Sequence, residues 1–285
     1  MRDSDEGRSA AERLYENDAD PAFRRRAIWI GSCLWRRFGG RSHNLLDIGC
    51  GRGFYFPLYE ALGSKIWGVE RDAVPLSLAR LRSQQSAAVV LDASAETLPF
   101  ADEAFDAIVM SEILEHLPDP VKALREARRV LVSQGLLLVT VPNANYPFPW
   151  DPINWILERT SGRPIRTGFF AGIWANHLRL YTHDALLDEV RNAGFVVCES
   201  HLHTRHCMPF THNIVYGIGK PLLEGAWLPG TWAKSAERAT SGEAHLSRNP
   251  VAKGIRLIRW FDRKNRDSEV GDEPTVNICV MATKR

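Results

Sequence analysis

An acid and three alternating glycines are the first residues in this chain whose types and spacing could bind a small molecule. Asp47 ends a short apolar run. It is followed at alternate positions by Gly49, Gly51 and Gly53. The apolar run is typical of a buried strand, and the glycines indicate a tight turn leaving it. Glycine allows a positive φ and lets backbone amides approach a ligand without a Cβ in the way. A ligand held there would lie at the N-terminus of a helix expected over residues 54–62.

Polar side chains also follow the next three apolar runs. Glu70 comes 21 positions after Gly49, and an acid about 20 residues past a glycine turn can accept hydrogen bonds from both ribose hydroxyls. Asp92 follows the next run, where a carboxylate can accept from the exocyclic amine of a purine. Ser111 and Glu112 follow the run after that. One such acid could be a helix cap or a solvated loop residue, but their recurrence indicates a nucleoside-like ligand.

Strand-like and helix-like segments alternate over the region that carries these residues. The expected strands are residues 44–48, 65–69, 88–91, 105–110 and 135–141, and the expected helices are residues 54–62, 73–84 and 120–131. Most of the strands are nearly continuous apolar runs, which is typical of strands covered on both faces. The pattern predicts an α/β fold with a parallel, doubly wound sheet. Right-handed crossovers then bring the polar strand ends to one edge, where ligands of such sheets bind.

With these motifs the sequence resembles the class I S-adenosylmethionine-dependent methyltransferases, of the methyltransferase type 11 kind. The resemblance covers about residues 45–141. It is carried by Leu46-Asp47-Ile48-Gly49-Cys50-Gly51-Arg52-Gly53, Gly68-Val69-Glu70, Leu98-Pro99-Phe100 and Leu114-Glu115-His116-Leu117. It implies a seven-stranded Rossmann-like sheet with an antiparallel last strand between the fifth and sixth, and insertions that form a lid.

The resemblance also implies S-adenosyl-L-methionine as the cofactor. The glycine turn would approach its methionine part, Glu70 would hold the ribose, and Asp92 with the backbone of Ala93 would hold the adenine. The full set expected to bind the cofactor is Asp47, Gly49, Cys50, Gly51, Glu70, Arg71, Asp92, Ala93, Ser111 and Glu112. A cationic sulfonium suits an acidic strand edge. An NAD-type oxidoreductase is the alternative, and the acid after the third strand argues against it.

The chain is expected to form one methyltransferase domain over residues 41–285, preceded by a tail and cover helices in residues 1–40. The remaining expected elements are a helix over residues 184–193 and strands over residues 195–200 and 276–282. Insertions are expected at about residues 143–182 and 204–274. The first is rich in aromatic side chains, which could grip an acceptor or form the insertion's own core.

Two histidines are candidates for proton transfer from a methyl acceptor. Methyl transfer from a sulfonium needs in-line approach at about 3–3.5 Å, so positioning can supply much of the rate. A hydroxyl acceptor would also gain from a base of near-neutral pKa. His177 and His116 are the catalytic candidates, and each could instead be structural. We expect methylation of a small-molecule or lipid-like acceptor at oxygen. The alternatives are methylation at nitrogen or carbon, or a cofactor-binding module without catalysis.

Another group of histidines raises the question of a metal site. His201, His203 and His212 lie near Cys207, and alternating histidines on a strand share a face. Their spacing matches no standard zinc pattern, and half of the group falls in a loop. We therefore expect no bound metal.

Composition and charge argue against several kinds of partner and compartment. The formal net charge of +2 gives no reason to expect nucleic acid. The five cysteines lack CxxC spacing, which argues against a disulfide framework and fits a reducing compartment. Residues 1–20 lack the apolar segment of a signal peptide. No apolar stretch approaches the roughly 18 residues of a membrane span. We expect a cytoplasmic protein with no transmembrane segment. The sequence carries no sign of its oligomeric state.

Two amphipathic helices carry clusters of basic residues. They are expected over residues 23–38 and 251–266. A basic amphipathic helix can lie on a membrane surface, so peripheral membrane contact stays open. We favour packing against the protein for both helices, with the arginines of the first in water.

Overall fold

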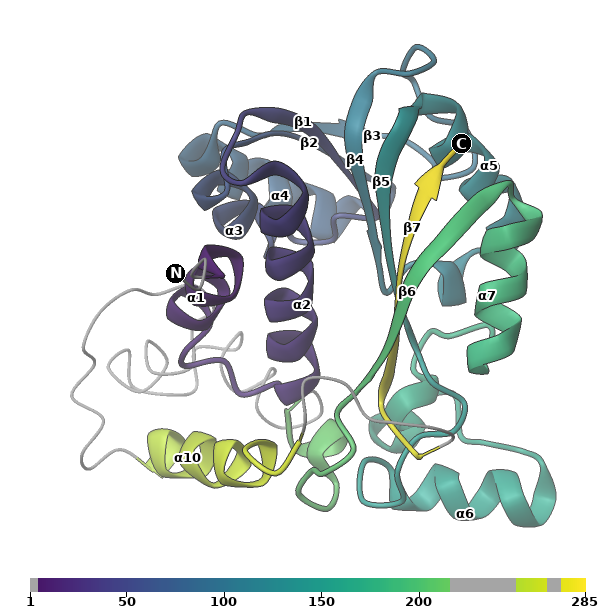
Figure 1. Ribbon diagram of the computed structural model, residues 1–285. Helices are drawn as coiled ribbons and strands as arrows, with labels where there is room; N and C mark the ends of the chain where they lie inside the picture. Colours follow the sequence, from purple (N-terminus) through teal and green to yellow (C-terminus); the bar gives the residue numbers. More distant parts are fainter. Residues whose placement is uncertain (1–4, 216–249, 266–272) are drawn as a thin grey trace.

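A seven-stranded sheet organises the part of the chain that the computed structural model describes, which is residues 5–215, 250–265 and 273–285 (Figure 1). The strands are β1 (His43–Ile48), β2 (Ser64–Glu70), β3 (Val89–Asp92), β4 (Phe105–Ser111), β5 (Leu131–Pro142), β6 (Phe195–His203) and β7 (Asn277–Lys284). Their order is β3-β2-β1-β4-β5-β7-β6, and β7 runs antiparallel to both of its neighbours. The prediction of a doubly wound sheet with an antiparallel seventh strand between the fifth and sixth is confirmed.

Helices cover both faces of this sheet. They are α1 (Glu6–Leu14), α2 (Pro21–Phe38), α3 (Phe56–Ala61), α4 (Ala73–Ser86), α5 (Pro120–Val130), α6 (Pro152–Ser161), α7 (His183–Asn192) and α10 (Pro250–Asp262), with 3₁₀ turns η1 (Leu114–His116) and η2 (Phe169–Trp174). On β1, Leu45 faces one core and Leu46 the other, as the two-residue period of a strand requires. The first core includes residues of α1, α2, α3 and α4, and the second includes residues of α5 and α7.

Side-chain caps set where several of the helices begin. Asp20 accepts a hydrogen bond from the backbone N–H of Ala22 at 3.0 Å, and Pro21 occupies the first turn of α2. Asp119 and Thr182 cap α5 and α7 in the same way. Such caps satisfy donors that the first helical turn leaves without partners.

Some of the predicted boundaries were wrong. Strand β5 begins at Leu131, directly after α5, rather than at residue 135. Strand β6 continues to His203, rather than ending at residue 200, because it pairs with β7 over that whole length. The predicted boundaries followed apolar periodicity. Both extensions are polar or irregular stretches, and they form strands because they pair with neighbouring strands.

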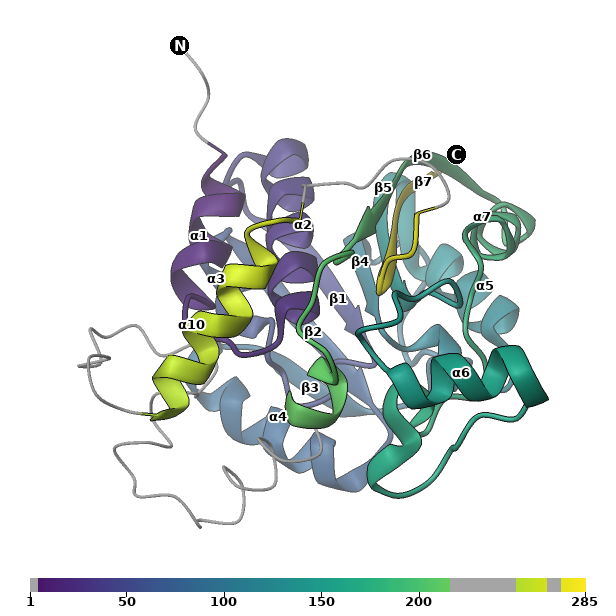
Figure 2. The same cartoon turned by 90° about the horizontal axis from the view of Figure 1, so that it is seen from below.

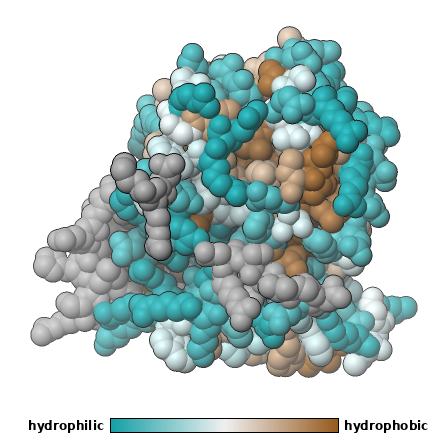
Figure 3. Space-filling model, viewed as in Figure 1, coloured by the Kyte–Doolittle hydropathy of each residue, from teal (hydrophilic) through white to brown (hydrophobic). Residues whose placement is uncertain are grey.

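The first insertion forms a small core of its own beside the sheet. Tyr146, Trp150 and Ile173 are buried there and pack with Cys207. Other apolar side chains of this region stay about half exposed, namely Phe148, Ile156, Phe169, Phe170 and Leu178. Apolar surface is visible along the lower edge of the space-filling view, where α6 lies (Figure 3). Some of these aromatics therefore form the insertion's own core, while the others are partly exposed to solvent.

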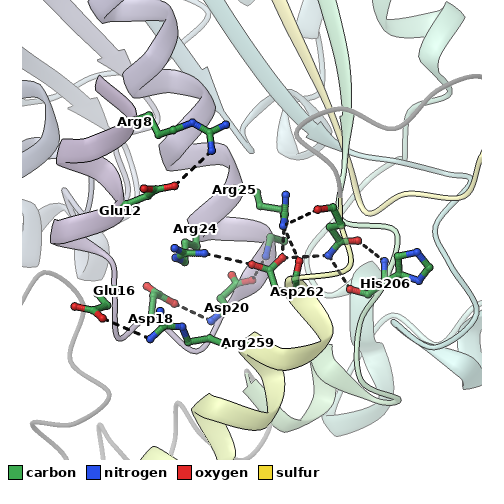
Figure 4. A network of polar contacts seen from close by, with 12 residues as sticks. Arg8, Glu12, Glu16, Asp18, Asp20, Arg24, Arg25, His206, Arg259 and Asp262 are labelled. Atoms are coloured by element: carbon green, nitrogen blue, oxygen red, sulfur yellow. Dashed lines mark hydrogen bonds and ion pairs between the residues drawn. The ribbon is translucent and has the colours of Figure 1, made fainter. Parts of the chain in front are cut away.

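Helix α10 lies against α2, and the two helices can be followed from below in Figure 2. Its Ile255 and Ile258 are buried, while Leu257 and Trp260 are about half exposed. Asp262 at its end pairs with Arg24 and Arg25 (Figure 4). The expectation that α10 packs on the protein holds for one of its faces. The second insertion otherwise falls largely outside the described residues.

Among the helices in the described ranges, none combines the length and apolar character that a membrane crossing requires.

Candidate functional site

The glycine turn lies at the C-terminal end of β1, as predicted. The backbone N–H groups of Gly49 and Cys50 both donate to the carbonyl of Val69, at 2.9 and 3.0 Å. Gly49 has φ +72°, and a Cβ there would lie 2.7 Å from the side chain of Ile113. Gly51 has φ +56°, yet a Cβ there would meet no atom within 4 Å. Gly49 is therefore required by packing, whereas Gly51 opens the turn toward the space where a ligand could approach.

Glu70 holds this turn in place. Its carboxylate accepts hydrogen bonds from the backbone N–H groups of Gly51 at 2.9 Å, Arg71 at 2.8 Å and Asp72 at 2.9 Å. A carboxylate offers about four lone-pair positions, so it can hold the backbone and still accept from another donor. The sequence predicted a ribose-binding acid, and the structure adds a bracing role that no sequence signal indicated.

Asp47 is a buried carboxyl beneath the turn. It is 2% exposed, and its Oδ2 atom has no hydrogen-bond partner. Burial raises the pKa of Asp47 to about 7, and the negative charge of Glu70 raises it further, while the hydroxyl of Tyr59 acts in the opposite direction. A cationic ligand group above the turn would favour the ionised form of this carboxyl.

The other residues expected to bind the cofactor differ in how exposed they are at the edge of the sheet. Register pairs Glu70 of β2 with Asp92 of β3, so these two acids lie on neighbouring strand ends. Asp92 and Arg71 are exposed, and Ala93 is half-buried. Cys50 is buried, and burial raises the pKa of its thiol. Cys50 can therefore present only backbone to a ligand.

Ser111 and Glu112 belong to a polar network that reaches into the protein. Ser111 Oγ lies 2.9 Å from Thr140 Oγ1, which donates to Glu112 at 3.0 Å. The side-chain amide of Asn277 donates to both oxygens of Glu112, at 3.2 and 3.1 Å. Arg26 pairs with the same carboxylate at 3.4 Å. The charge of Glu112 is therefore already balanced within the protein.

Arg26 is a residue whose place the sequence analysis got wrong. The arginines of α2 were expected in water, but Arg26 is only 7% exposed and also donates to Asn277 at 3.2 Å. Three consecutive arginines span about 200° of a helix, so they cannot all share its outer face. Arg26 lies three residues after the buried Phe23 and four before the buried Ile30. That spacing is the signal that could have placed it inside.

The two candidate catalytic histidines come together, with an acid that the sequence analysis did not consider. The rings of His116 and His177 lie 4.7 Å apart, edge to face. Glu115, which is fully buried, places Oε1 3.7 Å from His116 Nε2 and 3.9 Å from His177 Nε2. Burial, the neighbouring His116 and, more weakly, His212 lower the pKa of His177 to about 3. His177 is therefore neutral at pH 7 and a weak proton acceptor.

Of the other candidate metal ligands, His201 and His203 lie on β6, whereas His212 packs beside Trp150 and interacts electrostatically with His177. His201 and His203 stack with their centroids 6.0 Å apart, and His201 lies 3.3 Å from Glu199. Cys207 is buried in the core of the first insertion, and burial raises the pKa of its thiol to about 12. Within the described parts of the chain, these side chains do not converge as a set of three metal ligands.

Comparison with known proteins finds a methyltransferase domain in this chain. Residues 46–139 match a family model described as a methyltransferase domain. A probable S-adenosylmethionine-dependent methyltransferase of Mycobacterium tuberculosis is 32% identical over 102 residues, which are 36% of each chain. A ubiquinone biosynthesis O-methyltransferase of Cereibacter sphaeroides is 34% identical over 154 residues, which are 53% of this chain and 59% of the relative. The match thus spans from about a third to somewhat over half of these relatives' lengths.

Residues 46–139 therefore carry a methyltransferase domain, and the relatives support the class I S-adenosylmethionine-dependent kind. The fold of the chain also appears in solved structures of low identity. A candidate sarcosine dimethylglycine methyltransferase of Galdieria sulphuraria matches with a TM-score of 0.53 and 18% identity, covering 90% of this chain and 83% of its own. The cyclase SpnF matches with a TM-score of 0.51 and 20% identity, covering 90% and 81%.

The cofactor of this family is S-adenosylmethionine, and two features of the methyltransferase site fit it. The unpartnered Oδ2 of Asp47 is a buried acceptor that a cationic group would satisfy. The open space above Gly51 leaves room for a ligand against the backbone of the turn. Both features lie at the strand edge where open α/β sheets bind their ligands.

Proposed function

We propose that the protein transfers a methyl group from S-adenosylmethionine to a hydroxyl oxygen of a small-molecule or lipid-like acceptor. The observation that carries the proposal is the buried carboxyl of Asp47 under an open glycine turn, within a methyltransferase domain. The choice of oxygen is supported by the relatives described as ubiquinone biosynthesis O-methyltransferases. Half-exposed aromatic side chains near α6 support an apolar or ring-shaped acceptor.

In this proposal, residues at the ends of successive strands contact different parts of the cofactor. The backbone of Gly49, Cys50 and Gly51 faces the methionine part, with Asp47 beneath it. Glu70 and Arg71 face the ribose. The adenine lies against Asp92 and Ala93. Ser111 and Glu112 lie beside the cofactor, where Glu112 acts mainly through the network that fixes Ser111.

On the acceptor side, His116 and His177 are the proposed catalytic residues. In-line displacement leaves the bonding electron pair on sulfur while the acceptor oxygen forms the new bond to carbon. Most of the rate can come from positioning, because a preorganised approach removes a large entropic cost. The lowered pKa of His177 makes His116 the better candidate to accept the hydroxyl proton.

Calorimetric titration with S-adenosylmethionine tests the cofactor site. We expect binding by the unmodified protein and at least tenfold weaker binding by Glu70→Ala, because that change removes both the ribose acceptor and the brace of the turn. Glu60→Ala, an exposed acid on α3, is the matched control and should bind as the unmodified protein does. Absence of binding, or equal affinity in Glu70→Ala, would contradict the assignment.

Methyl-labelled cofactor then separates the candidate reactions. Phenols and catechols with apolar tails should become labelled, and the corresponding amines should not. Labelled amines would support the nitrogen alternative. A cofactor that binds but labels neither class would indicate a binding module or another reaction, and SpnF shows that a cyclase can have this fold.

A further inference from the structure

Three side chains with metal-binding atoms meet where η1 packs against the end of the first insertion. Glu115 and His116 come from η1, and His177 follows η2. The three ligand atoms lie within 4.8 Å of one another. Three ligands at about 2.1 Å from a tetrahedral cation would be about 3.4 Å apart, so the 3.7 and 3.9 Å separations need only a small contraction.

The carboxyl group of Glu115 lies where an ionised form is costly. The residue is 0% exposed, and neither of its oxygens has a hydrogen-bond partner. An ionised carboxylate in such a place is costly unless a cation pairs with it. The nearby negative charge of Glu112 adds to this cost, while the positive charge of Arg26 reduces it.

The surrounding backbone orients His116 as a ligand and holds the chain that carries His177 beside η1. His116 Nδ1 lies 2.9 Å from the carbonyl of Asn176, which accepts its proton and leaves the Nε2 lone pair toward Glu115. Ligating histidines almost always make such a hydrogen bond through their other nitrogen. Leu178 donates its N–H to the Glu115 carbonyl at 2.9 Å, so the chain carrying His177 is pinned to η1.

We propose that Glu115, His116 and His177 bind a divalent transition-metal cation. Two imidazoles and one carboxylate suit Zn²⁺, Co²⁺ or Mn²⁺ better than Mg²⁺ or Ca²⁺, which prefer oxygen ligands alone. Three protein ligands also leave positions free for a further ligand, as in catalytic metal sites. The site differs from the histidines of β6, and it uses residues on elements of the strand edge.

The role of this cation rests on the proposed function. A hydroxyl acceptor that reached a free position would lose its proton to solvent more readily. Its oxygen would then form the new bond to the methyl carbon as the carbon–sulfur bond breaks and sulfur keeps the electron pair. Both histidines would then act as ligands rather than as bases.

Metal binding can be tested without cofactor or acceptor. The full chain is treated with a chelator, dialysed, and titrated with Zn²⁺ by calorimetry and with Co²⁺ by visible absorption. We expect one tight site and at least tenfold weaker binding in Glu115→Gln and His116→Gln. His116 is about a third exposed, so its replacement should leave the fold intact.

His201→Gln is the matched control, because His201 also lies beside an acid, Glu199. It should bind metal as the unmodified protein does. No stoichiometric binding, unchanged affinity in both site variants, or loss of binding in His201→Gln would overturn the proposal. Metal binding without S-adenosylmethionine binding would instead support the metal site and contradict the proposed function.

Discussion

At the scale of single residues, Asp47 shows how burial changes what a motif residue can do. The motif predicted an acid at the cofactor, and its side chain lies under the turn at 2% exposure. Depth of burial depends on how the strand and its neighbouring elements pack, so the sequence motif alone could not supply it. The result is a carboxyl group that titrates near neutrality rather than near pH 4.

Asp47→Asn should therefore change the pH dependence of stability. The folded pKa of about 7 lies above the unfolded value, so the folded state holds a proton that the unfolded state has released. Stability from this group is present below about pH 4, falls as the pH rises to 7, and is constant above it. The loss is at most on the order of 4 kcal/mol, at 1.36 kcal/mol for each pKa unit.

Urea unfolding from pH 4 to pH 8 measures this effect as a difference between the variant and the unmodified protein. Asp47→Asn should gain relative stability with rising pH, while cofactor affinity should be weaker because the ionised acid is lost. A difference that does not depend on pH would contradict the raised pKa.

For other site residues, the sequence predicted the position but not the hydrogen-bond and ion-pair partners. Glu70 and Glu112 fall where the strand pattern placed them, since strand ends follow from apolar runs. Glu70 binds backbone N–H groups of the glycine turn and of the two residues that follow Glu70. The partners of Glu112, Arg26 and Asn277, come from distant parts of the chain. Glu115 was missed because an acid inside a helical turn gives no sequence sign of being buried.

At the scale of elements, the strands and helices of the first half were largely predictable, whereas the packing of α10 was not. Periodicity identifies an amphipathic helix but not the surface that it covers. In the structure, the buried carboxylate of Asp262 meets Arg24 and Arg25 across the α2–α10 contact (Figure 4). Asn265 next to α10 also donates to Asp262, at 3.1 Å.

Asp262→Ala should loosen α10 from α2. The change removes the acid that faces two largely buried arginines, and we expect a loss of about 1–3 kcal/mol in the free energy of unfolding. Amide hydrogen exchange should accelerate in α10 more than in the sheet. Glu199→Ala, which breaks the more exposed pair with Arg36, is the control and should cost less than about 1 kcal/mol. Equal costs for the two variants would show that burial of Asp262 does not matter.

At the scale of the whole molecule, the network around Arg26 joins three parts of the fold. Arg26 belongs to α2, Glu112 follows β4, and Asn277 begins β7. No local pattern could predict it, because its members are far apart in sequence and become neighbours only when the sheet is complete.

Arg26→Met should destabilise the molecule as a whole. It leaves Glu112 partly buried without its cation, and breaking such a pair costs about 3–5 kcal/mol. The double variant Arg26→Met with Glu112→Gln should recover part of that loss, because no unpaired charge remains. Urea unfolding of the two single variants and the double variant measures the coupling. Strictly additive losses would show that the pair acts independently.

The position of β7 has a consequence for how the protein is made. It hydrogen-bonds to β5 along one side and β6 along the other, although 73 residues separate it from β6. While the ribosome is still translating those residues, β5 has an open edge and β6 has no partner in the sheet. Open edges of this kind invite pairing with other chains. A nascent chain stalled before residue 277 should therefore bind chaperones or aggregate. The part of the site that faces the methyl acceptor would form only after β7 has paired with β5 and β6.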